Sequence, residues 1–161
     1  MNKVILLFLL ISSVSFGQKK LDKLLNKFNK NNVPYISVDS LTTTKAILLD
    51  AREVKEFNVS HLQNAICVGF DDFNIHTTLE KLPTDKNAKI VVYCSLGIRS
   101  EIVADKLIKK GYTNVFNLYG GIFEWKNNNF KVMDTLGKTT ERVHAFNKEW
   151  GKWLKKGEKV Y

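Results

Sequence analysis

Short apolar runs, each bounded by polar residues and too brief for a helix, recur along the middle of this chain. They cover residues 46–49, 65–68, 90–93 and 115–118, and a further short strand is predicted at residues 35–38. Such runs are typical of strands that are buried on both faces of a parallel sheet. Helical segments separate them, at residues 53–57, 73–82 and, most clearly, 100–110 before Gly111. Strands that alternate with helices in this way predict an α/β sandwich.

The chain contains 161 residues, of which 44% are apolar, and this suits a single domain with one core. We place that domain at residues 34–132. An amphipathic helix is predicted before it, over residues 18–33, because apolar side chains recur there at helical spacing between lysines. These side chains are Leu21, Leu24, Leu25 and Phe28.

The C-terminal residues 133–161 begin with a turn that contains Gly137. Large apolar residues then recur at helical spacing; they are Val143, Phe146, Trp150, Trp153 and Leu154. A stripe of this kind is typical of packing. We therefore predict a C-terminal helical extension that is docked on the domain.

Residues 1–17 have the pattern of a secretory signal peptide. Lys3 gives a positive start, residues 4–14 are almost all apolar, and Ser15 and Gly17 provide small residues before a cleavage site at Gln18. The apolar run is too short to span a bilayer comfortably, since a spanning helix needs about 20 residues. We expect an exported protein, periplasmic or extracellular, with no stable membrane association after cleavage. An uncleaved N-terminal anchor is the alternative.

The chain is basic, with a formal net charge of +9. Such a surface can attract small anions or nucleic acid. The lysines concentrate in residues 19–30 and 152–159, where no aromatic ladder that could stack bases lies among them. We therefore expect the charge to steer small anions, and we expect no nucleic-acid partner.

Cys94 follows the apolar run 90–93 and precedes a short loop and a helix start. The loop and the helix start consist of Ser95, Leu96, Gly97, Ile98, Arg99 and Ser100. Open α/β folds bind ligands at the carboxyl edge of the sheet, where such a cysteine lies. The loop N–H groups can form an anion-binding nest, and the helix dipole points its positive end at the same spot. These features favour a Cys94 thiolate, and Arg99 adds a fork of donors suited to an oxyanion.

Four motifs, in this order, resemble those of the rhodanese family, and the resemblance extends from about Ile36 to Val132. The motifs are Leu49-Asp50-Ala51-Arg52 with Glu56-Phe57, Ser60-His61-Leu62-Gln63-Asn64-Ala65, Cys94-Ser95-Leu96-Gly97-Ile98-Arg99-Ser100 and Leu118-Tyr119-Gly120-Gly121-Ile122-Phe123-Glu124-Trp125. The resemblance implies a three-layer sandwich with a five-stranded parallel sheet flanked by helices. It also implies a single-domain sulfurtransferase that carries sulfane sulfur as a persulfide on Cys94. Residues 95–100 would bind the substrate, with Arg99 holding its anionic group, and no cofactor or metal is implied.

The chain departs from the family pattern at two turn positions, where Ser60 and Asn64 replace the usual glycines. Both residue types are tolerated in turns. The loop carries no charge besides Arg99, whereas many members that favour thiosulfate have a further basic residue there. The resemblance therefore leaves the anionic donor open between thiosulfate and a polysulfide, with a thiol or cyanide as acceptor. We expect a monomer.

Other polar residues are interpreted as structural. Asp50, Arg52 and Glu56 are expected to form a charge network at the end of a strand, and His61 is expected to stabilise a turn by hydrogen bonding. His76 and His144 have no nearby partners at metal-ligand spacing, so we predict no metal site.

The two cysteines, Cys67 and Cys94, could form a disulfide in an exported protein. In the rhodanese sheet, however, the strand that carries Asp50 lies between the strands of the two cysteines. Two strand spacings are about 9–10 Å, beyond the Cα separation of ~7 Å that a disulfide tolerates. The resemblance thus implies that Cys67 is a buried packing residue and Cys94 a free thiol.

Two other functions compete with sulfur transfer. Cysteine-dependent phosphatases share the sheet, loop and helix plan, but they resemble Cys-x5-Arg, whereas four residues separate Cys94 from Arg99. A non-catalytic rhodanese-like binding module usually lacks the cysteine, which is present here. We therefore favour an enzyme similar to a thiosulfate sulfurtransferase.

Overall fold

The computed structural model describes residues 18–161, which form two compact units that divide between Asn31 and Asn32. The signal peptide proposed for residues 1–17 lies outside the described residues. In the first unit, residues 18–28 form a helix, and Asn31 has a left-handed φ of +57° that ends the helical path. The predicted N-terminal helix is therefore present, but it is shorter than residues 18–33. Among residues 18–161, every helix is too short or too polar to cross a membrane.

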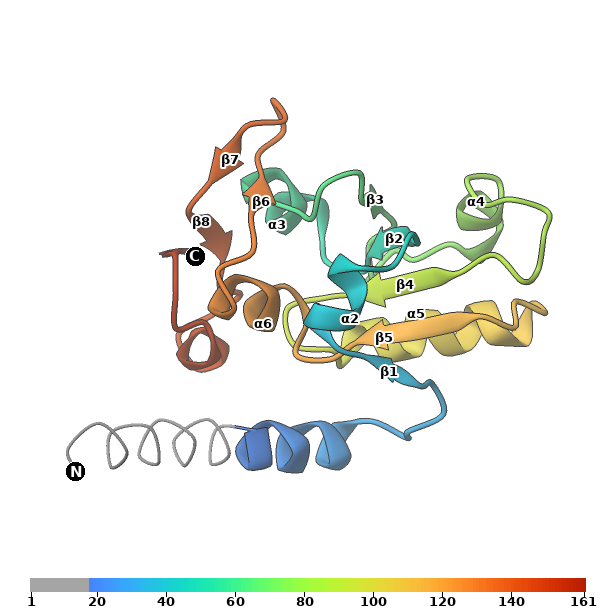
Figure 1. The fold of residues 1–161 in the computed structure, drawn as a ribbon, viewed down its shortest axis with the longest axis horizontal. Coiled ribbons are helices and arrows are strands. Elements are labelled where there is room, and N and C mark those ends of the chain that lie inside the picture. The colour runs from blue at the N-terminus through green and yellow to red at the C-terminus, as the bar shows by residue number, and fades with distance from the viewer. Residues whose placement is uncertain (1–17) are drawn as a thin grey trace. The chain divides into compact units, whose positions relative to one another are not determined.

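The second unit is built on a five-stranded sheet with helices in the connections between strands (Figure 1). Its elements in chain order are β1 (Tyr35–Ile36), α2 (Val38–Thr42), β2 (Ile47–Asp50), α3 (Val54–Val59), β3 (Ile66–Cys67), α4 (Ile75–Leu79), β4 (Ile90–Tyr93), α5 (Arg99–Lys109), β5 (Val115–Leu118), α6 (Gly121–Asn127), β6 (Val132–Met133), β7 (Thr139–Thr140), β8 (Arg142–His144), the 3-10 helix η1 (Trp150–Trp153) and β9 (Glu158–Val160). The sheet order is β1-β5-β4-β2-β3, and all of its strand pairs are parallel. The predicted α/β fold with a five-stranded parallel sheet is confirmed.

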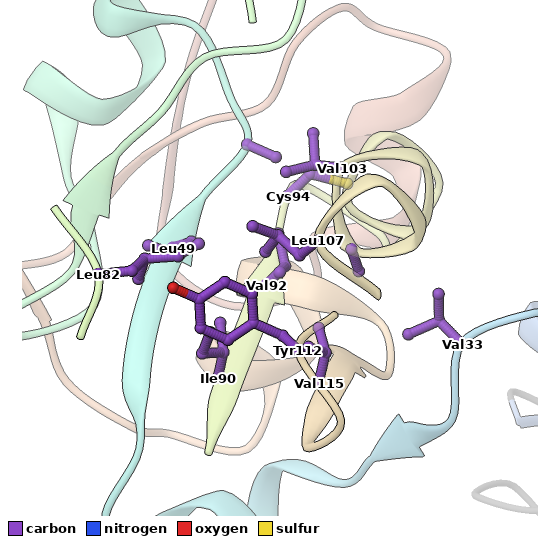
Figure 2. Packing of buried hydrophobic residues seen from close by; sticks show 12 residues of the cluster. Val33, Leu49, Leu82, Ile90, Val92, Cys94, Val103, Leu107, Tyr112 and Val115 are labelled. Atoms are coloured by element: carbon purple, nitrogen blue, oxygen red, sulfur yellow. The ribbon is translucent and has the colours of Figure 1, made fainter. Parts of the chain in front are cut away.

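The core forms around β4, the central strand, because all four of its residues are buried on one face or the other. Ile90 and Val92 meet Val103 and Leu107 from α5 in one cluster, and Cys94 lies at the end of that cluster beside Val103 (Figure 2). Full burial of one such aliphatic side chain contributes about 1.5–3 kcal/mol. Cys94, at the carboxyl end of β4, is therefore attached directly to the buried core.

Two short helices are absent from the sequence-based expectations. The structure forms α2 where a strand end and a polar stretch are predicted, and the Ser37 hydroxyl caps it by accepting the Ser40 N–H over 3.1 Å. It also forms α6 within the fourth motif, where the sequence analysis places no helix. Helices of five to seven residues carry too little of an apolar stripe to be recognised, and packing rather than propensity stabilises them.

The C-terminal extension is not the predicted helix, and this part of the fold prediction is corrected. Only η1 is helical, while β6 pairs with β7 and β8 pairs with β9, and β8 lies beside α3 (Figure 1). The apolar residues are spaced as in a helix, but Phe146 has a φ of +65°, which no α-helix accommodates. Pairing between distant strands overrides the local pattern.

Cys67 lies on the edge strand β3, and β2 separates it from β4. Asp50 is in register with Cys67 on one side and with Tyr93 on the other. Both cysteines are free thiols in the structure, with β2 between their strands. Cys67 is half-buried rather than fully buried, and burial raises the pKa of its thiol, which makes it a weak nucleophile.

The turn positions that depart from the family pattern adopt suitable backbone angles. Asn64 has a left-handed φ of +61°, a conformation that asparagine adopts more readily than most residues. Ser60 is fully buried, and its carbonyl accepts a hydrogen bond from Arg52 over 2.7 Å. The fold is therefore kept without the two glycines.

Candidate active site

Cys94 directly follows β4, and its sulfur lies in a cup formed by the loop and the first turn of α5. The Gly97 N–H donates to Sγ over 3.1 Å, and the Ser100 hydroxyl lies 3.5 Å from the same atom. The cysteine is 2% exposed, so these donors act where little water competes with them. The cup can therefore stabilise negative charge on the sulfur.

Asn117, a fully buried residue of β5, fixes the loop. Its Nδ2 donates to Gly97 O over 2.7 Å, and its Oδ1 accepts from the Ser100 hydroxyl over 2.7 Å. One amide thus joins the middle of the loop to the first turn of α5. Loss of this amide would leave buried polar groups without partners, at a cost of about 1–3 kcal/mol for each group.

The start of α6 holds the loop from another side. The Ile122 N–H donates to Cys94 O over 2.9 Å, and the Phe123 N–H donates to Ser95 O over 3.2 Å. The free N–H groups of the helix terminus therefore meet loop carbonyls instead of water. At Gly121, where φ is +55°, a Cβ atom would collide with Cys94 O and lie 2.7 Å from Ser95 C. Only glycine fits this contact.

Arg99 is paired with Glu56, which α3 contributes. Its Nη1 donates to Oε2 over 2.7 Å and its Nη2 donates to Oε1 over 2.8 Å, so both carboxylate oxygens are engaged. Arg99 Nη2 also donates to Ser95 Oγ over 3.1 Å. Glu56 is fully buried and additionally accepts the Glu53 N–H over 3.0 Å, which closes a capping box on α3. The guanidinium is therefore fixed in place, and its charge is balanced.

The pKa of Cys94 is set by opposing effects. Burial alone would raise it, but the charge of Arg99 and the hydrogen bonds from Ser100 and Gly97 outweigh burial, so the pKa lies below its ordinary value. Burial also raises the pKa of Glu56, and the hydrogen bonds and charge of Arg99 bring it below the ordinary range. The site therefore favours a thiolate next to a paired guanidinium and carboxylate.

A pocket of about 150 Å³ lies against Cys94. Its loop side is lined by Cys94, Ser95, Leu96, Ile98 and Arg99. Its other side is lined by Phe146 and Trp150 of the C-terminal extension. The extension therefore supplies two aromatic walls of the same pocket that the reactive cysteine borders.

Phe146 is held in an unfavourable backbone conformation, since its φ of +65° is rare for a bulky residue. Its N–H donates to His144 Nδ1 over 3.1 Å, and its ring centroid lies 5.1 Å from Arg99 Cζ. Burial lowers the pKa of His144, which favours the neutral ring whose Nδ1 accepts this bond. The hydrogen bond thus helps to hold the Phe146 ring over the guanidinium.

The predicted site residues fall into distinct groups in the structure. Cys94, Ser95, Leu96, Ile98 and Arg99 line the pocket, whereas Gly97 and Ser100 lie around the sulfur. Asp50 and Arg52 form a fully buried pair, with Oδ2 and Nη2 2.6 Å apart. Glu56 pairs with Arg99 instead. The three residues interpreted as one charge network therefore belong to two separate ion pairs.

His61 makes a ring contact and a hydrogen bond within its own turn. His61 stacks on Phe57 with ring centroids 3.8 Å apart, and its Nδ1 lies 3.1 Å from Phe57 O. Within residues 18–161, no group of three histidine, cysteine, aspartate or glutamate side chains is arranged to hold a metal ion.

Three residues of the site are missing from the sequence-based prediction. Asn117 had a usable signal, because it is a polar residue inside an apolar strand run. Phe146 and Trp150 had none that points to a site, because aromatic residues at helical spacing are typical of packing. Only the fold brings them to the loop, which lies about fifty residues earlier in the chain.

The sequence model of the rhodanese-like domain matches residues 19–128. The chain is 37% identical over 113 residues to the adenylyltransferase and sulfurtransferase UBA4 of Candida albicans, covering 68% of this chain and 26% of that protein. It is 36% identical over 87 residues to the tRNA uridine(34) hydroxylase of Erwinia tasmaniensis, covering 53% and 25%. The chain thus spans about a quarter of the length of these curated relatives.

Solved structures show the same fold. A rhodanese-related protein from Thermoplasma volcanium aligns with a TM-score of 0.55 at 24% identity, over 62% of this chain and 97% of that one. The thiosulfate sulfurtransferase from Pseudomonas aeruginosa aligns with a TM-score of 0.58 at 21% identity, over 78% and 24%. The family model covers well over half of the chain, and its relatives include sulfurtransferase-related proteins. The protein belongs to the rhodanese-like domain family.

Proposed function

We propose that this protein is a sulfurtransferase that moves sulfane sulfur from an anionic donor to a thiophilic acceptor through a persulfide on Cys94. The observation that carries the proposal is the cup around Sγ, with the Gly97 N–H 3.1 Å away and the Ser100 hydroxyl 3.5 Å away. The attacking thiolate carries its negative charge on this sulfur. These groups can therefore stabilise the nucleophile that accepts the sulfane sulfur.

In the first step, the Cys94 thiolate attacks the outer sulfur of the donor. With thiosulfate, a new S–S bond forms to Cys94 while the bond between the two donor sulfurs breaks. Sulfite leaves with the electron pair of that bond, and the cysteine carries a persulfide anion. A polysulfide reacts in the same way and leaves as a chain that is one sulfur shorter.

In the second step, the acceptor attacks the outer sulfur of the persulfide. Cyanide becomes thiocyanate, or a thiolate becomes a persulfide, and the electron pair of the broken S–S bond restores the Cys94 thiolate. The enzyme thus alternates between two forms, which predicts ping-pong kinetics. Every step uses only the cysteine and its donors.

The geometry favours this reaction over phosphatase chemistry. A phosphatase arginine must bind phosphoryl oxygens, but both terminal nitrogens of Arg99 already donate to Glu56. The N–H of Gly97 is directed at the sulfur itself. Glu56 also balances the charge of Arg99, and three of its five N–H groups are engaged by Glu56 and Ser95, so little of the guanidinium remains to neutralise a phosphoryl group.

The test is persulfide formation followed by turnover. Incubation with thiosulfate or a polysulfide should add the mass of one sulfur atom to the wild-type protein, and cyanide should remove it as thiocyanate. In Cys94→Ser, both signals should fall to background. Cys67→Ser is the matched control and should retain both, because Cys67 lies on the edge strand β3. Undiminished turnover in Cys94→Ser would exclude this mechanism.

We also propose that the protein is exported to the periplasm or the extracellular space, as a monomer. The proposal of export rests on the positive start and the apolar run of residues 1–17. N-terminal sequencing of the fractionated protein should find Gln18 as the first residue, and light scattering should give the mass of one chain. Recovery with an intact Met1 in the cytoplasmic fraction would contradict export.

A further inference from the structure

We infer that the pocket selects a singly charged organic sulfur donor with one small apolar group over the inorganic thiosulfate dianion, and that Phe146 and Trp150 determine this specificity. The inference rests on the proposed sulfur transfer and names the donor class. It follows from the charge of the pocket, the chemistry of its walls and its size.

The charge of the pocket is the first argument. Arg99 is the cation that lines it, and its terminal nitrogens are bound to both oxygens of the fully buried Glu56. The pair therefore offers little net positive charge to a substrate. A dianion that leaves water for this pocket loses hydration and finds no unpaired cation among the lining residues, which is unfavourable. A single negative charge next to the donors of the loop costs less.

The walls of the pocket are the second argument. Leu96 and Ile98 line the pocket from the loop, and Phe146 and Trp150 line it from the C-terminal extension. An inorganic anion has no apolar surface to place against these side chains. An organic group gains free energy by covering them, because apolar surface leaves water on both partners.

The size of the pocket limits that group. Its volume is about 150 Å³. An apolar protein cavity of about 150 Å³ binds benzene. The pocket therefore suits one ring or a short alkyl chain, with the outer donor sulfur directed at Cys94.

The reaction remains balanced for such a donor. The Cys94 thiolate attacks the terminal sulfur of an organic thiosulfonate, the S–S bond of the donor breaks, and the sulfinate leaves with the electron pair. Two negative charges enter the step, and two leave it, on the persulfide and the sulfinate. No oxidant or reductant is needed.

The two aromatic side chains can be removed without removing their support. The Trp150 N–H donates to Asn147 Oδ1 over 2.9 Å, and the Gly151 N–H donates to Asn147 O over 2.8 Å, so main-chain bonds hold the turn. Asparagine at position 146 keeps the left-handed backbone accessible and removes the ring. Trp153, in the same 3-10 helix, is absent from the pocket lining and provides a matched control.

The experiment compares kcat/KM for benzenethiosulfonate and for thiosulfate, two donors with the same outer sulfur and different remainders. Wild type should favour benzenethiosulfonate. In Phe146→Asn and in Trp150→Ala this preference should fall about tenfold, mainly through a higher KM for the aryl donor, as expected for loss of one apolar wall. Trp153→Ala should keep the wild-type preference.

The outcomes separate this inference from the proposed function. If neither donor forms a persulfide on Cys94, the proposed sulfur transfer itself fails. If both donors form it but wild type favours thiosulfate, the donor class is wrong. If wild type favours the aryl donor and both wall variants keep that preference, Phe146 and Trp150 do not determine specificity.

Discussion

The loop of residues 94–100 and the C-terminal segment of residues 146–150 line one pocket, but they are held in very different ways. The loop is bound by buried groups from three elements: Asn117 of β5, the first N–H groups of α6 and Glu56 of α3. The segment is partly exposed, contains Phe146 at a strained φ, and is held by the turn around Asn147.

This difference separates two tasks. Bond-making atoms must be held within a fraction of an ångström, and a buried loop with several fixed partners provides that. A wall that only contacts the remainder of the substrate can vary, and surface segments tolerate variation. We therefore expect changes near the loop to affect folding and chemistry together, whereas changes in the extension affect donor choice.

The largest expected effect is that of Gly121→Ala, and Gly137→Ala is its matched control. At Gly121 the new Cβ collides with the Cys94 carbonyl, so we expect a loss of at least about 3 kcal/mol in the free energy of unfolding. At Gly137, φ is +73° but nothing lies within 4 Å of a Cβ, so only the backbone penalty of about 1 kcal/mol remains. Urea unfolding of both variants measures the two costs. Equal costs would mean that the contact with the loop is not tight.

A smaller effect is expected for Asn117→Ala. It removes the amide that joins Gly97 O to the Ser100 hydroxyl, and buried partners are left unsatisfied, which costs about 2 kcal/mol. Asn114→Ala is the matched control, because its amide bond to Asn87 O is exposed and should be worth less than about 0.5 kcal/mol. Denaturant midpoints and persulfide formation rates check both. A stable and fully active Asn117→Ala protein would show that the loop holds its own shape.

The smallest effect is expected for Ser100→Ala, and it concerns pH. Its hydroxyl helps to lower the pKa of Cys94. In the variant, the pH at which the rate of persulfide formation rises should therefore be higher than in wild type. Because the pKa of Cys94 is depressed in the folded state, ionisation stabilises the fold above the unfolded-state pKa, and this stabilisation is lost as pH falls through the folded-state pKa. Ser100→Ala should therefore lose this part of the stability at neutral and higher pH, and at every pH it should lose a further ~1 kcal/mol because the buried Asn117 Oδ1 no longer accepts the Ser100 hydroxyl.

Ser95→Ala is the control for this pH experiment. Its hydroxyl bonds to Arg99 and Glu56 rather than to the Cys94 sulfur. Its rate profile should keep the wild-type midpoint, measured by thiolate absorbance and by the rate of persulfide formation. A shift as large as that of Ser100→Ala would mean that the Arg99 position, and not the serine hydroxyl, sets the pKa.

Much of the fold could be predicted because its strands are continuous apolar runs and its longest helix has a clear stripe. The position of Cys94 between β4 and α5 followed directly from that alternation. The short helices α2 and α6 could not be predicted, because five to seven residues carry too little of an apolar stripe. The strands of the extension could not be predicted, because strand pairing overrides the helical spacing of its apolar residues. The sequence analysis grouped Glu56 with Asp50 and Arg52, whereas in the structure Glu56 pairs with Arg99. Proximity in sequence does not reveal which carboxylate faces which cation.

The sequence by itself determined the sheet, the place of the reactive cysteine and the loop that surrounds it. These features depend on local patterns: burial on both faces of a strand, and a cysteine between a strand end and a helix start. The tertiary structure alone decided the pairing of Arg99 with Glu56, the anchoring of the loop by Asn117, and the aromatic walls of Phe146 and Trp150. Each of these joins segments distant in sequence, and such contacts form only when the whole chain packs.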